Sequence, residues 1–357
     1  MKRNPMGRPN RRSFLLASAV ALVAAPYVWS RRAGAAQQLM VRTPGGAFDD
    51  VKRKTVYDPF REATGIEIVP VAATVAKMLA MFKAGEAEID AIDTGNDALL
   101  ELENNGALVP LDYKSFKYTN PDDIDSAVRL TYQVGAFTYA FVLGFNTTVY
   151  AVGKEPKNWA EFWDIKAFPG PRTLAGMESG APNLEIALIA DGVPMDKLYP
   201  LDIDRAFKSM SRVKPAVKKF WDTGALSAQM LADKEAVLGV IWSTRLQVAA
   251  AGGAPLAAQW NQNQILVQSY GIPKVSKNAE AALKYIDYAS SPEVQARWLS
   301  AYNAIPVNVK AYAATPKQLI DPETNLPWTK SKGFMNDIKW WAENRTKVSQ
   351  AWANWVL

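Results

Sequence analysis

The chain has 357 residues, 49% of them hydrophobic and 21% charged, which is typical of a globular protein and long enough for two domains with separate cores. It contains no cysteine and no histidine, which excludes zinc sites built from those residues, haem held by them, Ser-His-Asp triads and thiol nucleophiles. Seven of its 41 basic residues lie in the first 36 residues, which hold no acid, so the remainder carries 34 basic and 35 acidic residues. That near balance gives no electrostatic reason to expect nucleic acid or anionic lipid as a partner.

The first 36 residues have the order of regions of a secretory signal. Residues 2–12 are basic, residues 14–29 are mostly apolar, and an A-x-A cleavage site follows near Ala35 or Ala36. The apolar run is short for a membrane span, and residues 10–16, NRRSFLL, resemble a twin-arginine export signal. We therefore predict cleavage near residue 36 or 37 and a soluble periplasmic protein. The alternative is an uncleaved N-terminal anchor.

Short apolar runs then alternate with longer periodic segments, a pattern typical of βα units on a largely parallel sheet. It predicts strands at 39–41, 66–71 and 89–93, and helices at 48–64, 75–84 and 97–104. The apolar run at 136–146 is too long for a strand within one lobe and suits a strand that crosses between two lobes. After it we expect helices at 159–163, 184–190, 204–211, 225–231, 246–251, 280–289, from 292 onward and at 339–356, with strands at 236–242 and 268–273.

These elements predict an α/β protein of two lobes, each a sheet flanked by helices, joined by hinge strands. The second crossing strand would be 268–273. We predict a signal peptide at 1–36, a first lobe of 37–142 plus 268–308, and a second lobe of 143–267 plus 309–357.

In open α/β sheets, ligands bind beyond the carboxyl ends of the strands, where helix N-termini point their amides. This rule selects two loops in the first lobe. The glycines of the TPGGAF loop would let backbone approach a ligand, or would only form a tight turn. The TGND loop would reach a ligand, or would only cap the helix after it. The candidate binding residues in these loops are Gly45, Gly46, Phe48, Gly95, Asn96 and Asp97.

Two further loops lie in the second lobe, one after the predicted strand at 236–242 and one before the predicted helix at 184–190. Trp242 at the end of its strand could stack on an apolar stem or a cation, or belong to the core. Arg245 could clamp a carboxylate through two hydrogen bonds, or form an ion pair. Glu178 and Ser179 lie before the 184–190 helix. The remaining candidates lie on or next to the crossing segments and are Tyr139, Trp260, Gln268 and Tyr270.

Neighbouring acids such as Asp49-Asp50, Asp93 with Asp97 and Asp122-Asp123 invite a hydrolase interpretation. With 35 acids in the chain such neighbours are expected by chance, and two carboxylates indicate catalysis only in the right geometry. We therefore predict no catalysis, no cofactor and no metal site. Four Trp near the C-terminus recur at helical spacing and predict a packing face, namely Trp340, Trp341, Trp352 and Trp355.

At this level of detail the chain resembles the spermidine/putrescine-binding family of periplasmic binding proteins that serve ABC importers, over residues 39–356. The resemblance rests on the order and spacing of PGGAFDDVKRKTVYDPFREATGIEI, EIDAIDTGNDALLELENNGALVPLD, YAFVLGFNTTVY, NWAEFWDIKAFPGPRTL, ADGVPMDKLYPLDIDRAF, AVLGVIW and YGIPKVSKNAEAALKYIDYASSPE. It implies the type II fold of two α/β lobes, a cleft that closes on a solute, an inner-membrane permease as partner, and no catalysis.

The resemblance also implies how the solute would be held. Polyamine binders of the family grip ammonium groups with carboxylates and aromatic rings. The stacking Trp is retained as Trp242, whereas the expected acids fall near Ser179, Pro182 and Gln268. A buried diamine without counter-charges would be costly. Asp97 or Glu178 would restore one acid, and Arg245 would suit a carboxylate. We expect a small amine-bearing solute, either polyamine-like or an amino-carboxylate such as γ-aminobutyrate, bound by a monomer.

Two other functions remain open at this point. A ferric-ion binding protein of the same architecture would need adjacent tyrosines as ligands, and the sequence has no Tyr-Tyr pair. An enzyme exported by the twin-arginine route is the other alternative, and the chain lacks Cys, His and a phosphate-cradling glycine motif.

Overall fold

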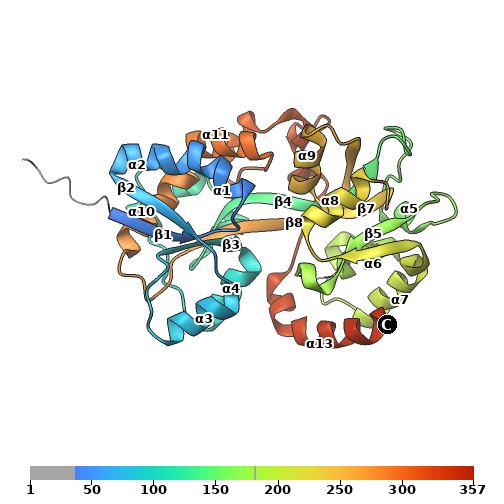
Figure 1. Cartoon of the computed structure of the whole chain (residues 1–357), viewed down its shortest axis with the longest axis horizontal. Helices are drawn as coiled ribbons and strands as arrows, with labels where there is room; N and C mark the ends of the chain where they lie inside the picture. The colour runs from blue at the N-terminus through green and yellow to red at the C-terminus, as the bar shows by residue number, and fades with distance from the viewer. Residues whose placement is uncertain (1–36, 181) are drawn as a thin grey trace, which may run out of the picture. The chain divides into compact units, whose positions relative to one another are not determined.

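The structure is a computed structural model that describes residues 37–180 and 182–357, so the signal peptide predicted at 1–36 lies outside the described residues. Nine strands of the described part form one mixed sheet, in the order β2-β1-β3-β8-β4-β7-β5-β6 with β11 beside β8 (Figure 1). Their bounds are β1 (Gln37–Arg42), β2 (Ile66–Val71), β3 (Ala91–Gly95), β4 (Val134–Asn146), β5 (Arg172–Ala175), β6 (Val217–Trp221), β7 (Leu238–Trp242), β8 (Leu256–Gly271) and β11 (Gly333–Met335). A separate hairpin pairs β9 (Ile320–Asp321) with β10 (Leu326–Pro327).

Two long antiparallel strands, β4 and β8, join the parallel ladder β2-β1-β3 to the parallel ladder β7-β5-β6. Their pairing runs from Val134 opposite Tyr270 to Asn146 opposite Leu256. All but one of the 13 residues of β4 are buried, which explains its unbroken apolar run. The crossing predicted at 136–146 is thus confirmed. The second crossing was predicted at 268–273, but the strand has 16 residues, because its buried Asn and Gln residues break the apolar pattern.

The helices of the β1–β3 half pack on both faces of its ladder. They are α1 (Ala47–Lys52), the π-helical turn η1 (Arg53–Tyr57), α2 (Asp58–Thr64), α3 (Val75–Lys83), α4 (Asn96–Asn104), α10 (Ala279–Ser290) and α11 (Pro292–Tyr302). The helix predicted at 48–64 is therefore real but contains a π turn. It ends where Gly65 adopts a left-handed φ of 75°, a conformation that glycine reaches without strain.

The helices of the β5–β7 half are α5 (Trp159–Trp163), α6 (Leu184–Ala190), α7 (Ile203–Val213), α8 (Gly224–Ala232), α9 (Ser243–Ala251), α12 (Trp328–Ser331) and α13 (Ile338–Val356). The Asn158 side chain caps α5 by accepting a hydrogen bond from the Glu161 amide, at 2.8 Å. The sequence missed β5 and β6. The first has only four residues, and the second is an edge strand whose two lysines face solvent. Short 3₁₀ turns lie at 113–115, 121–123, 126–128, 177–179, 195–197, 214–216, 309–314 and 317–319.

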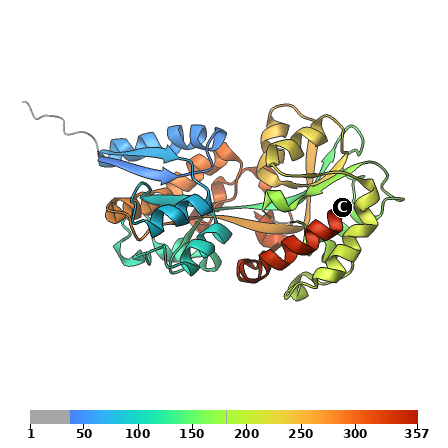
Figure 2. The same cartoon turned by 60° about the horizontal axis from the view of Figure 1, so that its bottom comes forward.

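The core is divided into clusters that follow the two halves. One cluster joins β1, β2, α10 and α11 to the first residues of β4, and another joins α5, α6 and α7 to the later residues of β4. Figure 2 shows α13 in red at the C-terminal end of the chain. Its Trp341 is buried, and its Trp352 and Trp355 pack on Phe207 and Phe220, so the predicted packing face is confirmed. No helix in the described part of the chain combines the length and apolar character needed to cross a bilayer.

A buried carboxyl anchors α13 to α6. Glu185 Oε1 accepts hydrogen bonds of 2.6 Å from both the Tyr199 hydroxyl and the Trp341 indole. Burial raises the pKa of Glu185, and the hydrogen bonds oppose that shift only in part. Its Oε2 and the Oε1 of neighbouring Gln264 are buried acceptors without hydrogen bonds among the described residues. A proton carried by Glu185 would supply the donor that this pair of acceptors lacks.

We predict that Glu185→Gln removes a pH-dependent loss of stability. When the pKa of Glu185 is higher in the folded than in the unfolded state, protonation of Glu185 stabilises the fold. This contribution is complete at pH values below the pKa of the unfolded state, about 4.3, and is lost as the pH rises through the pKa of the folded state. Thermal midpoints measured from pH 4 to pH 8 should show the variant gaining on wild type as the pH increases. Glu178→Gln, at an exposed carboxyl, is the control and should follow wild type. A constant offset between Glu185→Gln and wild type would contradict the prediction.

Candidate functional site

Two adjoining cavities lie where strands of both parallel ladders end. One has a volume of about 220 Å³, and we name it the aromatic cavity. The other, of about 400 Å³, contains Asp97 and is named the Asp97 cavity. They share four lining residues, Arg42, Thr94, Tyr139 and Trp242, so we describe them together as the cleft. Arg42 ends β1, Thr94 is near the end of β3 and Trp242 ends β7, which places the cleft at the carboxyl ends of these strands.

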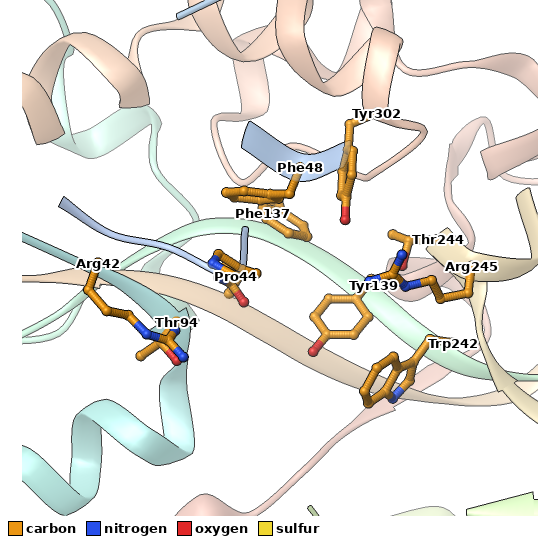
Figure 3. A pocket seen from close by; sticks show the side chains of 11 residues that line it. Arg42, Pro44, Phe48, Thr94, Phe137, Tyr139, Trp242, Thr244, Arg245 and Tyr302 are labelled. Atoms are coloured by element: carbon orange, nitrogen blue, oxygen red, sulfur yellow. The ribbon is translucent and has the colours of Figure 1, made fainter. Parts of the chain in front are cut away.

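Five aromatic rings line the aromatic cavity (Figure 3). Phe137 and Tyr139 are two residues apart on β4 and therefore point to the same face of the sheet. Tyr302, at the end of α11, meets Phe48 edge-on with ring centroids 5.4 Å apart. Tyr139 meets Trp242 edge-on at 6.3 Å. The rings form a box of apolar walls whose faces can attract a cation.

Trp242 is held in place from behind. Its ring packs edge-on against Trp221 at 5.3 Å and at a tilt against Phe141 at 6.2 Å. Gly224, at the start of α8, leaves room for it, because a Cβ at that position would lie 2.5 Å from Trp242 Cε3. The absence of a side chain at Gly224 therefore sets how deep the indole sits.

Arg245 and Thr244 enter the cavity from the first turn of α9, at the end opposite Arg42 and Thr94 (Figure 3). Within the described residues, the Arg245 guanidinium donates no hydrogen bond and forms no ion pair. No side chain caps the N-terminus of α9. The donors and the helix dipole at this end of the cavity favour an anion.

The Arg42 guanidinium, in contrast, forms hydrogen bonds with the backbone. Its Nε and Nη1 each donate a 3.0 Å hydrogen bond, to the carbonyls of Ala73 and Asp93. Burial lowers the pKa of Arg42, while the Asp93 carboxylate opposes the shift. Burial also raises the pKa of Tyr139 and Tyr302, so both phenols stay neutral at physiological pH. The cleft therefore offers two neutral hydroxyl groups beside its charges.

A buried ion pair supports the wall of the cavity. Lys52 Nζ lies 2.6 Å from Asp93 Oδ2, and both side chains are fully buried. The other Asp93 oxygen accepts a 2.7 Å hydrogen bond from Gln268 Nε2, and Gln268 lines the cavity. Because its amide nitrogen is engaged there, Gln268 has its carbonyl oxygen left to accept a hydrogen bond from a ligand.

The Lys52 ammonium is enclosed by aromatic rings. It donates a 2.7 Å hydrogen bond to the Tyr270 hydroxyl and lies 5.0 Å from the centroid of Phe48 and 4.8 Å from that of Trp298. Burial lowers the pKa of Lys52, and its ion pair with Asp93 opposes that change. The Lys52 ammonium thus contacts Phe48, one of the rings that line the cavity. Through Asp93 it also positions the side-chain amide of Gln268, which lines the same cavity.

Asp97 is on the first turn of α4, and its ion-pair partner Arg345 lies on α13, a helix of the β5–β7 half. Arg345 Nη2 on α13 lies 3.3 Å from Asp97 Oδ2, and Nη1 donates to the Gly180 carbonyl. Both side chains are partly exposed. No group of three or more acids suited to hold a metal occurs in the described part of the chain.

Most of the residues selected from the sequence lie in the cleft. The cavities bring together Phe48, Gly95, Asn96, Asp97, Tyr139, Ser179, Trp242, Arg245 and Gln268. Gly45 and Gly46 shape the turn before Phe48, with φ of 81° and 61°, but are outside the lining, where Pro44 takes their place. Glu178 is exposed and also outside it.

Two aromatic candidates do not reach the cavities. Tyr270 is fully buried, because its hydroxyl serves Lys52 beneath the wall. Trp260 is 5% exposed and stacks on Trp328. A register shift in β8, together with the left-handed φ of 60° at Gln262, turns this end of the strand away from the cleft.

The sequence missed several lining residues. Arg42 could have been found, since it directly follows the strand predicted at 39–41. Phe137 could also have been found, two residues from Tyr139 on a predicted strand. Tyr302 ends α11 and Arg345 lies within α13, both far along the chain, and no local pattern indicates that they face the same space.

Known proteins resemble this chain over most of its length. Residues 55–326 match the family described as bacterial extracellular solute-binding protein. The chain is 26% identical over 328 residues to a gamma-aminobutyric acid-binding protein of Pseudomonas aeruginosa, covering 90% of this chain and 91% of that protein. It is 25% identical over 282 residues to the spermidine/putrescine-binding periplasmic protein 1 of Haemophilus influenzae, covering 76% of each. A solved ABC transporter substrate-binding protein from Bradyrhizobium japonicum has a TM-score of 0.79 and 30% identity, covering 90% of this chain and 100% of that one.

We predict that Lys52→Met strongly destabilises the protein, because it leaves the buried Asp93 carboxylate without its counter-charge. The expected loss is about 3–5 kcal/mol in the free energy of unfolding. Urea denaturation followed by tryptophan fluorescence measures it. The double variant Lys52→Met with Asp93→Asn removes the stranded charge and should recover much of the loss. A cost below about 1 kcal/mol for Lys52→Met alone would show that the pair is not needed.

Proposed function

Because the chain belongs to the bacterial extracellular solute-binding protein family, as the substrate-binding component of an ABC transporter, we propose that it captures a small solute carrying both an ammonium and a carboxylate. Its fold is the two-lobed α/β fold of periplasmic binding proteins. The observation that carries the proposal is that one cavity combines an aromatic box with the guanidinium of Arg245, which has no hydrogen-bond or ion-pair partner among residues 37–180 and 182–357. γ-Aminobutyrate is the simplest solute with this chemistry.

The carboxylate would bind at the Arg245 end. Arg245 has donors to spare, and the first turn of α9 adds backbone amides and the positive end of the helix dipole. A guanidinium can hold a carboxylate through two parallel hydrogen bonds, which fixes orientation as well as charge. Thr244 lies beside it on the same turn and lines the same cavity.

The ammonium would lie in the aromatic box. Ring faces attract a desolvated cation, with energies of about 2 kcal/mol in favourable sites. Gln268 adds a carbonyl acceptor whose amide end is fixed by Asp93. The volume of about 220 Å³ suits a solute with a short carbon chain.

Capture would work by closure of the lobes. The cleft is lined by β1 and β3 residues of one ladder and β7 residues of the other, so a bound solute touches both sides. A solute that contacts both lobes only when they are closed shifts the population to the closed form. That form would present the solute to the membrane permease. We infer that the protein acts as a monomer, binds no nucleic acid and performs no catalysis itself.

A polyamine is the second candidate, because the Haemophilus influenzae relative is a spermidine/putrescine-binding protein. Each of the two ammonium groups of a diamine needs either a carboxylate or several hydrogen-bond acceptors. Among the described residues that line the cleft, Asp97 is the only acid, and Arg345 already pairs with it. Asp93 lies behind the wall with its charge matched by Lys52. The charges thus favour an amino-carboxylate over a diamine.

We also infer the place of action and the lobe boundaries. The family is one of bacterial extracellular proteins, and the Haemophilus influenzae relative is named periplasmic. Residues 1–36 would direct export by the twin-arginine route and be removed, leaving a soluble periplasmic protein. We propose a division into 37–142 plus 268–308 and 143–267 plus 309–357. The core clusters change along β4 between Phe137 and Phe141, slightly before the proposed boundary at 142.

We predict that the purified full-length chain binds a small amino-carboxylate, and that Trp242→Ala weakens binding at least about thirtyfold, because a central stacking aromatic typically contributes about 2 kcal/mol or more. Isothermal calorimetry against amino acids, γ-aminobutyrate, betaines and polyamines measures both. Absence of binding to every solute would reject the proposal.

A matched pair of arginine variants tests the carboxylate end. Arg245→Gln should weaken carboxylate solutes while leaving simple amines little changed. Arg205 on α7 is exposed and pairs with Asp191 at the end of α6, outside the cleft, so Arg205→Gln should change neither. Equal losses for both classes of solute with Arg245→Gln would argue against a carboxylate at this position.

We predict that export depends on Arg11 and Arg12. Cell fractionation with an antibody should find the wild-type chain in the periplasm, and mass spectrometry should find a mature N-terminus near residue 36 or 37. Substitution of both by Lys should retain the unprocessed chain in the cytoplasm, because the twin-arginine route reads that pair. Equal processing of both chains would indicate another export route.

A further inference from the structure

The cleft contains an imbalance of charge that one residue controls. Its described lining residues include three guanidinium groups, those of Arg42, Arg245 and Arg345, and one carboxylate, that of Asp97. Arg42 donates to two backbone carbonyls, and Arg245 makes no contact with an acid among the described residues. Whether the cleft can offer an acid to a solute therefore depends on whether Arg345 occupies Asp97.

Arg345 is held in a position where it pairs with Asp97. One guanidinium nitrogen lies 3.3 Å from Asp97 Oδ2, and the other donates to the Gly180 carbonyl. The guanidinium carbon also lies 5.9 Å from the ring of Trp341, whose indole is fixed by Glu185. Two lobes thus hold this one side chain: α13 and the 177–180 turn from one side, and α4 from the other.

The pair remains within reach of a solute. The exposed fractions of the Arg345 and Asp97 side chains are 38% and 43%, and both line the same cavity as Tyr139 and Trp242. Glu101, one turn along α4, lies with them beside a neighbouring space between α4 and α13 but does not line the cleft. Asp97 is therefore the acid that a second ammonium would seek.

We propose that Arg345 is a specificity-determining residue that keeps Asp97 from serving as the counter-charge of a second ammonium, and so selects amino-carboxylates against diamines. The inference rests on the proposed function. An ammonium that approached Asp97 would meet the Arg345 guanidinium, a like-charge contact that rejects it. A carboxylate meets no such opposition in the cleft, because Arg245 and Arg345 both attract it.

The same ion pair crosses between lobes, so it could act merely as a latch that favours closure. The two roles differ in what they do to selectivity. A latch contributes the same free energy whichever solute is bound, so its loss weakens all solutes by one common factor. A counter-charge effect changes the ratio of the affinities for a diamine and an amino-carboxylate. Removing Arg345 should move that ratio in one direction, and removing Asp97 should move it in the other.

The experiment uses γ-aminobutyrate and putrescine, which share an ammonium on a short chain and differ in carrying a carboxylate or a second ammonium. Calorimetry gives both affinities for the full-length wild type, Arg345→Gln and Asp97→Asn. Arg345→Gln should raise the affinity ratio of putrescine to γ-aminobutyrate about tenfold or more, and Asp97→Asn should lower it, because one exposes an acid and the other an unpaired cation. Arg345→Lys keeps the positive charge and should leave the ratio near that of wild type.

Arg205→Gln, which breaks an exposed Arg–Asp pair outside the cleft, is the matched control and should leave both affinities unchanged. Equal weakening of both probes by Arg345→Gln and Asp97→Asn would overturn the inference and leave Arg345 as a latch. A ratio that moves in the same direction in both variants would also overturn it. A wild-type protein that binds neither probe would overturn this inference. Only a protein that binds none of the solutes in the calorimetric screen would also overturn the proposed function, and both results are distinct from an unchanged ratio.

Discussion

The buried ion pair of Lys52 and Asp93 is the interaction on which the rest of the site depends. Two charges removed from water are stable only when close contact and further hydrogen bonds compensate the lost hydration. Here the contact is 2.6 Å, Tyr270 accepts from the ammonium and Gln268 donates to the carboxylate. The pair therefore ties α1, β3 and β8 together directly beneath the cavity wall. It also removes from the cleft the charge of an acid that would otherwise face a solute.

The second constraint is the direction of the strands. Each parallel ladder ends toward the cleft, so loops that are distant in sequence converge there with the N-termini of α4 and α9. Arg245 and the N-terminus of α9 lie at one end of the aromatic cavity, and aromatic rings from β4 and α11 line its walls. A solute with unlike ends matches such an arrangement better than one with identical ends.

Local patterns in the sequence were enough to predict much of this. The βα order, the long crossing strand at 136–146 and the three selected loops that follow predicted strands are visible because apolar periodicity and strand ends follow from local chemistry. Trp260 and Tyr270 were predicted to line the cleft but do not. A register shift in β8 changes the direction of Trp260, and the buried Lys52 holds the Tyr270 hydroxyl beneath the wall. Tyr302 and Arg345 could not be predicted, because their positions depend on how α11 and α13 pack, which is not encoded in neighbouring residues.

The pairing of β8 with β3 and β4 has a consequence for how the chain reaches this structure. Residues 147–255, between the two long strands, include all of β5, β6 and β7, so these three strands are inserted in sequence between β4 and β8. Contacts such as Val134 with Tyr270 close a very long loop, and non-local pairing of this kind slows folding. During synthesis the inserted segment can begin to pack early, whereas the wall that holds Gln268 must wait for residue 271, and the core around α6 and α7 is completed only when α13 has been made.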